Sequence, residues 1–282
     1  MSTWQPSARE LERRQVRRSL RRRSVLIATA VTVAVFAAVA VGLTSSPGWA
    51  TVRSTFFDAG VARETFPAIL DGLWINIKLF LICEVFILVL GLAVALARTA
   101  RSPWLTPVRV LAVLYVDLFR GVPTVLLVLL LGFGVPALEL QGLTNDRYVW
   151  AGVALVLSYG AYVAEVFRSG IESIHPSQLN SASALGLSRA QSMRFVVVPQ
   201  AVRRVAPPLL NDFISLQKDT ALVSIVGVFD AVFAARDSTG YLFNYTPYVV
   251  VAAMFIAMTI PLARVTDWLG RRALARERAG AL

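Results

Sequence analysis

Apolar stretches near or above twenty residues recur from the N-terminal quarter of the chain to its C-terminus. Each stretch is long enough to cross a hydrocarbon core of about 30 Å as a single helix. The chain is 56% hydrophobic over 282 residues, which is too apolar for a soluble domain of this size. The sequence therefore predicts an all-α integral membrane protein with no separate soluble domain.

Clusters of arginine at the ends of these stretches predict the orientation of the chain. Eight arginines precede the first stretch: Arg9, Arg13, Arg14, Arg17, Arg18, Arg21, Arg22 and Arg23. The positive-inside rule places such a tail in the cytoplasm. Six spans then keep every arginine cluster on the cytoplasmic side, whereas an odd number of spans does not. The predicted spans cover about residues 25–43, 68–97, 107–133, 149–168, 208–230 and 247–268.

The first apolar stretch has a competing interpretation as a cleaved signal peptide. The basic region before it is long, and the sequence "LTSSPGWA" after it is a poor cleavage site. We therefore expect this first span to be retained.

Several classes of enzyme lack their signature in this sequence. Lys78 and Lys218 are the two lysines, and because neither follows a glycine there is no G-x-x-x-x-G-K-[ST] phosphate loop. The single histidine, His175, excludes the H-E-x-x-H zinc motif, and no serine lies in a G-x-S-x-G motif. Cys83 is the only cysteine, so neither an internal disulfide nor a cysteine-based metal site is expected. No catalytic residue and no metal ligand is predicted.

The net charge of +11 would also suit nucleic-acid binding. The arginines, however, gather at the ends of the apolar stretches and in the two tails, as membrane orientation requires. We therefore expect no nucleic-acid partner and a chain surrounded by the lipid bilayer.

Ionisable residues also occur within the predicted spans, where each costs about 2.5 to 3.5 kcal/mol to insert. They are Asp71, Lys78, Glu84, Asp117, Arg120, Glu165, Arg168, Asp212, Lys218, Asp219 and Asp230. Asp117 lies three residues before Arg120, and Glu165 three before Arg168, so each pair shares a helix face. Two interpretations stay open: the charges neutralise one another between helices, or some of them line the path of a charged or zwitterionic solute.

The stretch "FRGVPT", Phe119 to Thr124, is expected to interrupt the third span. Pro123 lacks an N–H and disfavours the helical conformation at Val122, and Gly121 weakens the turn before it. Broken backbone at membrane depth is tolerated only where it is buried in protein or lines a watery cavity. A structural kink and a part of a translocation pathway are both compatible with this break.

A mostly polar stretch from Ser169 to Ala201 separates the fourth and fifth predicted spans. Ser177 is a candidate N-cap for a short helix beginning near Gln178, and Gly186 is the predicted end of that helix. A second helix is expected to follow. Such a helix, turn and helix on the cytoplasmic face can present one side to a soluble partner.

Four motifs, taken in order, resemble the permease subunits of type I ABC importers, specifically the polar amino acid uptake family. They are "YVDLFRGVPT" from Tyr115, "YGAYVAEVFRSGIESI" from Tyr159, "NSASALG" from Asn180 with the later Pro199, and "LQKDTALVSIVGV" from Leu216. The resemblance covers about residues 68–269. Where the family signature has an acidic residue and an alanine, this chain has Asn180 and Ser181.

The resemblance implies a five-helix type I importer core with a cytoplasmic coupling helix, to which the N-terminal span is extra. Together with the charge pattern, it predicts a basic cytoplasmic tail (1–24), the extra span (25–43), an extracytoplasmic loop (44–67), the transmembrane domain (68–269) and a cytoplasmic tail (270–282). Residues 172–203 within the transmembrane domain are called the coupling segment below.

The resemblance also implies a function and a set of partners. The chain would carry a polar amino acid, such as glutamate or a related one, delivered by an extracytoplasmic binding protein. Two copies of an ABC ATPase would bind ATP and Mg, with no cofactor in this chain, and a second permease subunit, identical or homologous, would complete the pathway. The expected location is the bacterial inner membrane, with both termini in the cytoplasm.

Two sets of site residues follow from the motifs and from the charges at depth. The expected contacts with the ATPase are Asn180, Ser181, Ala182, Ala184, Leu185, Gly186 and Pro199. The candidates for the substrate pathway are Arg120, Glu165, Lys218 and Asp219. Because Asn180 replaces an acidic residue, a charge-paired contact with the ATPase is expected to be absent.

Two other classes of function remain as alternatives. A membrane enzyme acting on lipid-linked substrates through Asp117 or Glu165 would turn over alone in detergent without ATP. A gradient-driven carrier or channel would transport in liposomes without an ATPase partner.

Overall fold

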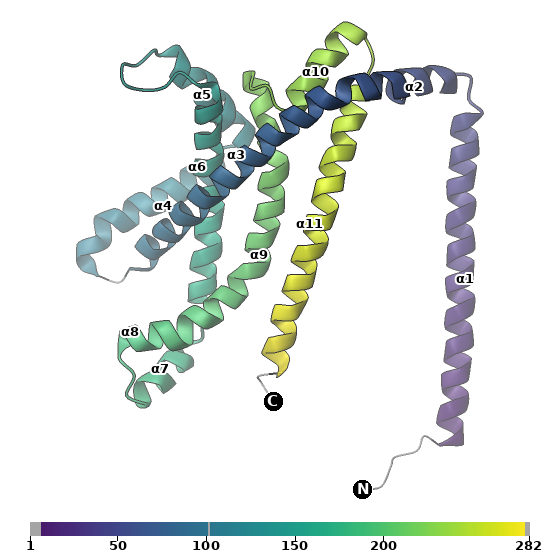
Figure 1. Cartoon of the computed structure of the whole chain (residues 1–282). Helices are drawn as coiled ribbons and strands as arrows, with labels where there is room; N and C mark the ends of the chain where they lie inside the picture. The colour runs from purple at the N-terminus through teal and green to yellow at the C-terminus, as the bar shows by residue number, and fades with distance from the viewer. Residues whose placement is uncertain (1–6, 101, 280–282) are drawn as a thin grey trace. The chain divides into compact units, whose positions relative to one another are not determined.

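The computed structural model describes residues 7–100 and 102–279, and within these ranges the chain is helical with no strand (Figure 1). The α-helices are α1 (Ala8–Thr44), α2 (Trp49–Phe56), α3 (Ala59–Thr99), α4 (Thr106–Gly121), α5 (Thr124–Ala137), α6 (Arg147–Glu172), α7 (Pro176–Ala184), α8 (Arg189–Ser192), α9 (Val198–Asp219), α10 (Ala231–Leu242) and α11 (Thr246–Ala279). Short 3-10 helices at Pro103–Leu105 and Thr220–Val226 and a π-helical turn at Met193–Val197 complete the order. The all-α prediction is confirmed.

The chain divides into two compact units, one up to Thr55 and one from Phe56 onward. In the first unit, Ser7 caps α1 by accepting the backbone N–H of Glu10 at 3.3 Å. Since α1 runs from Ala8 to Thr44, it contains the predicted span 25–43 and most of the basic tail before it. The rest of the description concerns the second unit.

The segment predicted as an extracytoplasmic loop, 44–67, is mostly helical. It contains α2 and the first turns of α3. The Asp58 carboxylate accepts from the backbone N–H groups of Gly60 at 2.8 Å and Val61 at 3.1 Å. Because this cap satisfies amides that would otherwise lack a partner, α3 begins at Ala59, well before the predicted start of the second span.

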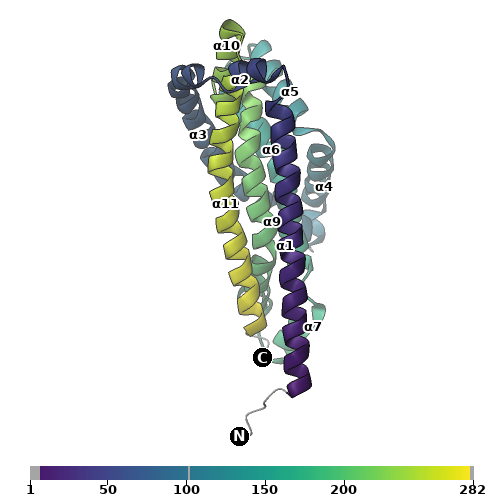
Figure 2. The ribbon, with the colours of Figure 1, turned by 90° about the vertical axis from the view of Figure 1, so that its right-hand side faces the viewer.

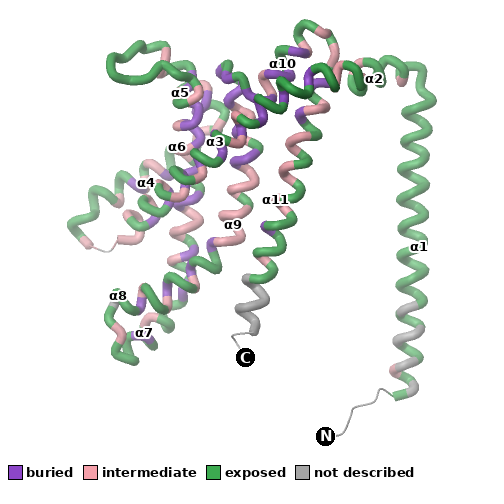
Figure 3. The backbone as a smooth tube through the Cα atoms, in the orientation of Figure 1, coloured by how far each residue is buried: buried purple, intermediate pink, exposed green. Residues whose placement is uncertain are grey.

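The main core of the second unit lies where α3 packs on α6 (Figure 3). Small residues permit this close approach, because an added Cβ at Gly91 of α3 would lie 2.6 Å from Val163 Cγ1 of α6. On α6 the buried face includes Ala154, Leu155 and Ala164. The two helices therefore form a rigid frame on which the other helices pack.

The third predicted span, 107–133, is broken at "FRGVPT", as the sequence indicates. The helices before and after the break, Pro103–Gly121 and Thr124–Ala137, are bent by 101°. Val122 is extended, with φ −95° and ψ 130°, as expected for a residue that precedes proline.

Side chains hold the two halves of the broken span on α6. The Tyr115 hydroxyl of α4 donates to the Leu157 carbonyl oxygen at 2.7 Å. The hydroxyls of Thr124 on α5 and Ser158 on α6 lie 2.8 Å apart. The break is therefore packed against protein, where irregular backbone is tolerated.

The number of spans differs from the six predicted. Among the described residues, four helices are long and apolar enough to cross a membrane, or five if the bent pair is one span. The predicted span 208–230 is not one continuous helix, because α9 ends at Asp219 and a 3-10 helix follows to Val226. The charges of α9 lower its hydropathy: Arg203, Arg204, Asp212, Lys218 and Asp219.

The charged helix α9 packs between α6 and α11, and it runs beside α11 in two views (Figures 1 and 2). The Thr259 hydroxyl of α11 donates to Gln217 Oε1 of α9 at 2.7 Å. Gln217 is buried, with 2% of its surface exposed. Protein contacts therefore shelter part of α9 that its hydropathy alone would not keep in a bilayer.

Candidate functional site

The short helix α7 in the coupling segment begins two residues earlier than predicted. Its N-cap is His175, whose ring Nδ1 accepts the backbone N–H of Ser177 at 3.2 Å. Pro176 occupies the first helical position, where a missing N–H costs nothing. The prediction of Ser177 as the cap is therefore wrong, and His175 is an exposed capping residue.

The end of α7 is the turn predicted at Gly186. The backbone N–H of Gly186 donates to the Ser183 carbonyl at 3.0 Å, and that of Leu187 to the Ala182 carbonyl at 3.1 Å. Gly186 has φ +78°, the left-handed conformation that this pair of hydrogen bonds requires. An added Cβ would meet no atom there, so the backbone angle alone selects glycine.

The residues predicted to contact the ATPase do not all face outward. Asn180, Ser181, Ala184 and Gly186 are exposed, and Leu185 exposes 81% of its surface. Ala182 is buried, with 3% exposed, and packs on the inner side of α7. The outward surface at the end of α7 therefore lacks Ala182, whose side chain is buried against the chain itself. Asn180 is exposed but borders a cavity on the inner side of α7.

A π-helical turn connects the second half of the coupling segment to α9. The Val198 N–H donates to the Met193 carbonyl, five residues back. Pro199, two residues into the new helix, has no N–H and its ring would clash with the carbonyl four residues earlier. A widened turn just before Pro199 relieves that clash, and Pro199 itself is exposed at the start of α9.

The coupling segment is fixed at both of its ends to the transmembrane helices. The Arg204 guanidinium of α9 donates to the Ser173 carbonyl at the end of α6. An added Cβ at Gly170 of α6 would lie 2.1 Å from Val205 Cγ1 of α9. A displacement of α7 can therefore pass directly to α6 and α9.

Glu165 on α6 lies among arginines from three helices. Arg98 of α3 donates to Glu165 Oε2 at 2.6 Å, and Arg120 Nη1 of α4 lies 3.9 Å from the same oxygen. Arg168, on α6 itself, pairs with both Glu165 and Glu172. This arginine cluster joins α3, α4 and α6 near the end that carries the coupling segment.

Asp117 and Arg120 do not pair with each other, so neutralisation of one by the other, one of the two open interpretations, does not apply to them. Arg120 instead approaches Glu165, and its guanidinium lies over the Tyr162 ring at 5.6 Å from the centroid. Asp117 is exposed and forms no ion pair within the described part of the chain. The pairing of Glu165 with Arg168 is as predicted.

Aromatic residues on α6 connect this cluster to α9. The Tyr159 hydroxyl donates to Asp219 Oδ2 at 2.8 Å, and the rings of Tyr159 and Tyr162 lie 6.4 Å apart. Three of the four pathway candidates, Arg120, Glu165 and Asp219, therefore lie along one side of α6. Lys218 is exposed and forms no ion pair among the described residues.

A buried polar cluster between α3 and the start of α10 was not predicted from the sequence. Asn76 Nδ2 donates to Asp230 Oδ2 at 2.9 Å, and Asn76 Oδ1 accepts the Ala231 N–H at 3.1 Å. Asp230 also caps α10 by accepting the Phe233 N–H at 2.8 Å. The charge of Asp230 within a predicted span indicates that this residue needs a partner. The sequence does not identify that partner, because Asn76 lies 154 residues away.

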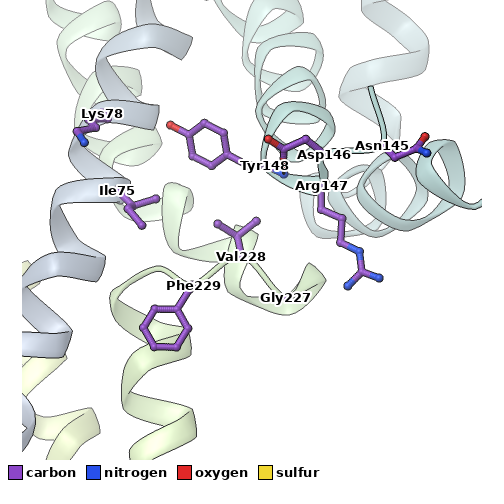
Figure 4. A pocket seen from close by; sticks show the side chains of 9 residues that line it. All are labelled: Ile75, Lys78, Asn145, Asp146, Arg147, Tyr148, Gly227, Val228 and Phe229. Atoms are coloured by element: carbon purple, nitrogen blue, oxygen red, sulfur yellow. Dashed lines mark hydrogen bonds between the residues drawn. The ribbon is translucent and has the colours of Figure 1, made fainter. Parts of the chain in front are cut away.

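A hollow of about 670 Å³ lies at the other end of α6, beside the loop that contains Gly227 (Figure 4). Lys78 of α3 and Asp146, the N-cap of α6, bring opposite charges to its lining. The Arg147 guanidinium lies over the Phe133 ring at 5.2 Å and donates to the Val226 carbonyl at 3.4 Å. A lining with charges of both signs suits a zwitterionic solute. Within the described ranges, no group of three or more His, Cys, Asp or Glu residues could hold a metal ion.

Comparison with known proteins places these features in one family. Residues 87–274 match the family described as "Binding-protein-dependent transport system inner membrane component". The arginine transport system permease protein ArtQ of Bacillus subtilis (strain 168) is 32% identical over 197 residues, covering 70% of this chain and 88% of ArtQ. The glutamine transport system permease protein GlnP of Escherichia coli (strain K12) is 30% identical over 217 residues, covering 77% of this chain and 97% of GlnP.

Solved structures give the same result. A chain from the crystal structure of an amino acid ABC transporter with histidines superposes with a TM-score of 0.70 at 29% identity, covering 76% of this chain and 98% of that one. A chain of the inward-facing MetNI methionine ABC transporter has a TM-score of 0.61 at 17% identity, covering 74% of this chain and 97% of that one. The second likeness concerns the fold alone.

Proposed function

The chain belongs to the family of binding-protein-dependent transport system inner membrane components, and we propose that it carries a polar amino acid across the membrane for an ATP-driven importer. It is a permease subunit, a transport component rather than an enzyme. The family implies an ATPase, a substrate-binding protein and a second permease as partners.

The geometry of the coupling segment supports this proposal most strongly. Leu185, an apolar side chain that is 81% exposed, lies beside the Gly186 turn at the tip of α7. Because two backbone hydrogen bonds fix the turn, this leucine is held at a defined position from which it can pack into an apolar recess of a partner. Two ATPase subunits, one for each permease, would receive these turns and supply ATP and Mg, because the sequence itself has no phosphate loop.

The transmission of motion follows from the contacts of the coupling segment. Arg204 holds the start of α9 to the end of α6, and Gly170 lets Val205 approach α6 closely. Closure of the ATPases would move α7 and, with it, α6 and α9. Because α6 packs on α3, α4 and α5, that motion would change the space between the helices of the two permeases.

The proposed solute pathway follows α6. The hollow with Lys78 and Asp146 would form the outer mouth, and Arg120, Glu165, Lys218 and Asp219 would line the deeper part. Cationic and anionic side chains on one path suit a solute with both an ammonium and a carboxylate group. The N-terminal tail, the coupling segment and the C-terminus would lie in the cytoplasm, and the outer mouth would face the binding protein.

The substrate class is a polar amino acid. The names of two relatives specify arginine and glutamine, and a solved relative is described with histidines. These side chains share polarity and differ in charge, so the likeness supports the class and not the narrower expectation of glutamate.

Co-purification with the native partners tests the proposal. The chain should isolate an ABC ATPase whose hydrolysis of ATP rises when the binding protein and its amino acid are added. Leu185→Glu should prevent this association, because it places a charge in the apolar contact. Leu138→Glu, an exposed leucine after α5, is the matched control and should leave the association intact. Transport by the chain in the absence of any ATPase would support a gradient-driven carrier instead.

A further inference from the structure

A cavity of about 750 Å³ lies between the coupling segment and the transmembrane helices. The ends of α3 and α6, the first half of α4, the short helix α7 and the π-helical turn all contribute to its walls. Its polar lining includes Arg98, Arg109, Glu172 and Asn180. The cavity therefore lies on the inner side of α7, directly beneath the element proposed to receive the motion of the ATPase.

The charge of this lining is not balanced. Arg98 is paired with Glu165, and Glu172 with Arg168. Arg109 donates to the backbone carbonyls of Ala100 and Ser102 but belongs to none of the ion pairs among the described residues. Because carbonyl oxygens carry no formal charge, Arg109 leaves one uncompensated positive charge at the wall of the cavity.

The remaining wall is apolar and large enough for a small organic molecule. Ile171, Ile174, Leu179, Met193 and Val197 line it. Its volume lies within the range of sites that bind small molecules. A fixed guanidinium beside an apolar wall suits a ligand with an oxyanion at one end and an apolar body at the other.

We propose that this cavity binds an oxyanion, a carboxylate or a phosphate, that is attached to an apolar body. The oxyanion lies between Arg109 and Asn180, and the apolar body lies against Leu179 and Met193. Bound there, the ligand connects α7 to α4 and fixes the position of the coupling segment. Its source is either a small carboxylate from solution or an anionic phospholipid of the surrounding leaflet.

Asn180 explains why this chain has room for such a ligand. A glutamate at this position would add a carboxylate to the same wall as Arg98 and Arg109. The neutral Asn180 leaves the charge of Arg109 to an external anion. We therefore expect Asn180→Glu to replace the ligand, so that the variant no longer responds to it.

Thermal unfolding of the purified full-length chain in detergent tests the binding. Sodium hexanoate and phosphatidylglycerol are the two probes. The control for hexanoate is sodium chloride at equal ionic strength, and the control for phosphatidylglycerol is phosphatidylcholine. At about one hundred times the Kd, a probe that binds only the folded chain should raise Tm by about 5 °C or more. A response to hexanoate identifies a carboxylate from solution, and a response to phosphatidylglycerol alone identifies a lipid.

Three variants of the cavity wall and one surface control locate the response in this cavity. Arg109→Gln and Asn180→Glu should lose the rise in Tm, Arg109→Lys should keep most of it, and Arg264→Gln on the exposed surface of α11 should keep all of it. The proposal is overturned if neither probe stabilises the wild-type chain beyond its control, or if Asn180→Glu responds as the wild type does. Because Asn180 is exposed, Asn180→Glu is expected to fold, and it tests the proposal even if Arg109→Gln does not fold.

The effect of the ligand on coupling rests on the proposed function, whereas the binding does not. In the complex with the ATPase, the responding probe should change the rate of ATP hydrolysis in the wild type and leave it unchanged in Asn180→Glu. Binding without any associated ATPase activity would contradict the proposed function and leave the cavity site supported.

Discussion

Arg98 of α3 donates to Glu165 of α6 at 2.6 Å, and their side chains are only 14% and 25% exposed. The two residues lie 67 positions apart in the sequence. Each lies near the C-terminal end of its helix, α3 or α6. Arg120 and Arg168 approach the same carboxylate. Glu165 therefore holds three helices together, in addition to any contact with a solute.

Glu165→Gln should destabilise the chain. The substitution removes the charge that balances Arg98, and the loss of a partly buried ion-pair partner costs about 1 to 3 kcal/mol. Thermal unfolding in detergent should show a Tm lower by several degrees. Asp267→Asn is the matched control, because Asp267 is 55% exposed and lies 4.0 Å from Arg264, and it should leave Tm unchanged. Equal stability of the two variants would mean that the arginine cluster does not hold the helices.

Asp219→Ala and Lys218→Ala should reduce uptake while leaving assembly with the ATPase normal. Asp219→Ala removes the carboxylate that accepts the hydrogen bond of the Tyr159 hydroxyl. A hydrogen bond to a charged group contributes about 1.5 kcal/mol or more, which corresponds to about a tenfold change in an equilibrium constant. Uptake by proteoliposomes and co-purification of the ATPase are measured on the same samples. Asp237→Ala, an exposed residue of α10, is the control. If assembly fails in the Asp219 variant, this residue is structural.

Gly186→Val should weaken the coupling of transport to ATP hydrolysis. The φ of +78° costs about 1 to 2 kcal/mol for a residue with a Cβ, and more when that carbon is branched. The turn after α7 would then shift. Gly186→Asn should be tolerated, because asparagine adopts this conformation more readily. ATP hydrolysis stimulated by the binding protein is the measurement, and identical rates in the two variants would contradict the role of the turn.

Gly72→Ala should destabilise the packing of α3 on α10. An added Cβ would lie 2.4 Å from the Asp230 carbonyl carbon, a backbone atom that cannot move aside easily. Overpacking of this kind costs about 1 to 3 kcal/mol or more. Gly134→Ala on α5 meets no atom within 4 Å and should be neutral or slightly stabilising. The difference in Tm between the two alanine variants measures the effect.

The local features of the chain were predictable from the sequence. Pro123 and Gly186 act through their own backbone restrictions, so the break in the third span and the end of α7 occur where their residues predict them. The ordered motifs likewise predicted the family. Each of these inferences depends on residues close together in the sequence.

The contacts between distant segments were not predictable in the same way. Nothing in the sequence around Arg98 indicates Glu165, 67 residues away, as its partner. Asn76 carries no charge, and its hydrogen bond to Asp230 depends on the packing of α3 against α10. The span 208–230 was predicted as one helix because its apolar pattern does not show that α9 ends at Asp219 and that a 3-10 helix follows to Val226.

Uptake of a labelled polar amino acid into proteoliposomes tests the central claim most directly. The vesicles contain this chain with its co-purified ATPase and binding protein, and the measurement is made with and without ATP. The proposed function predicts uptake that requires both ATP and the binding protein and that falls sharply in Leu185→Glu. Uptake of equal rate without ATP, or by the chain alone, would contradict it.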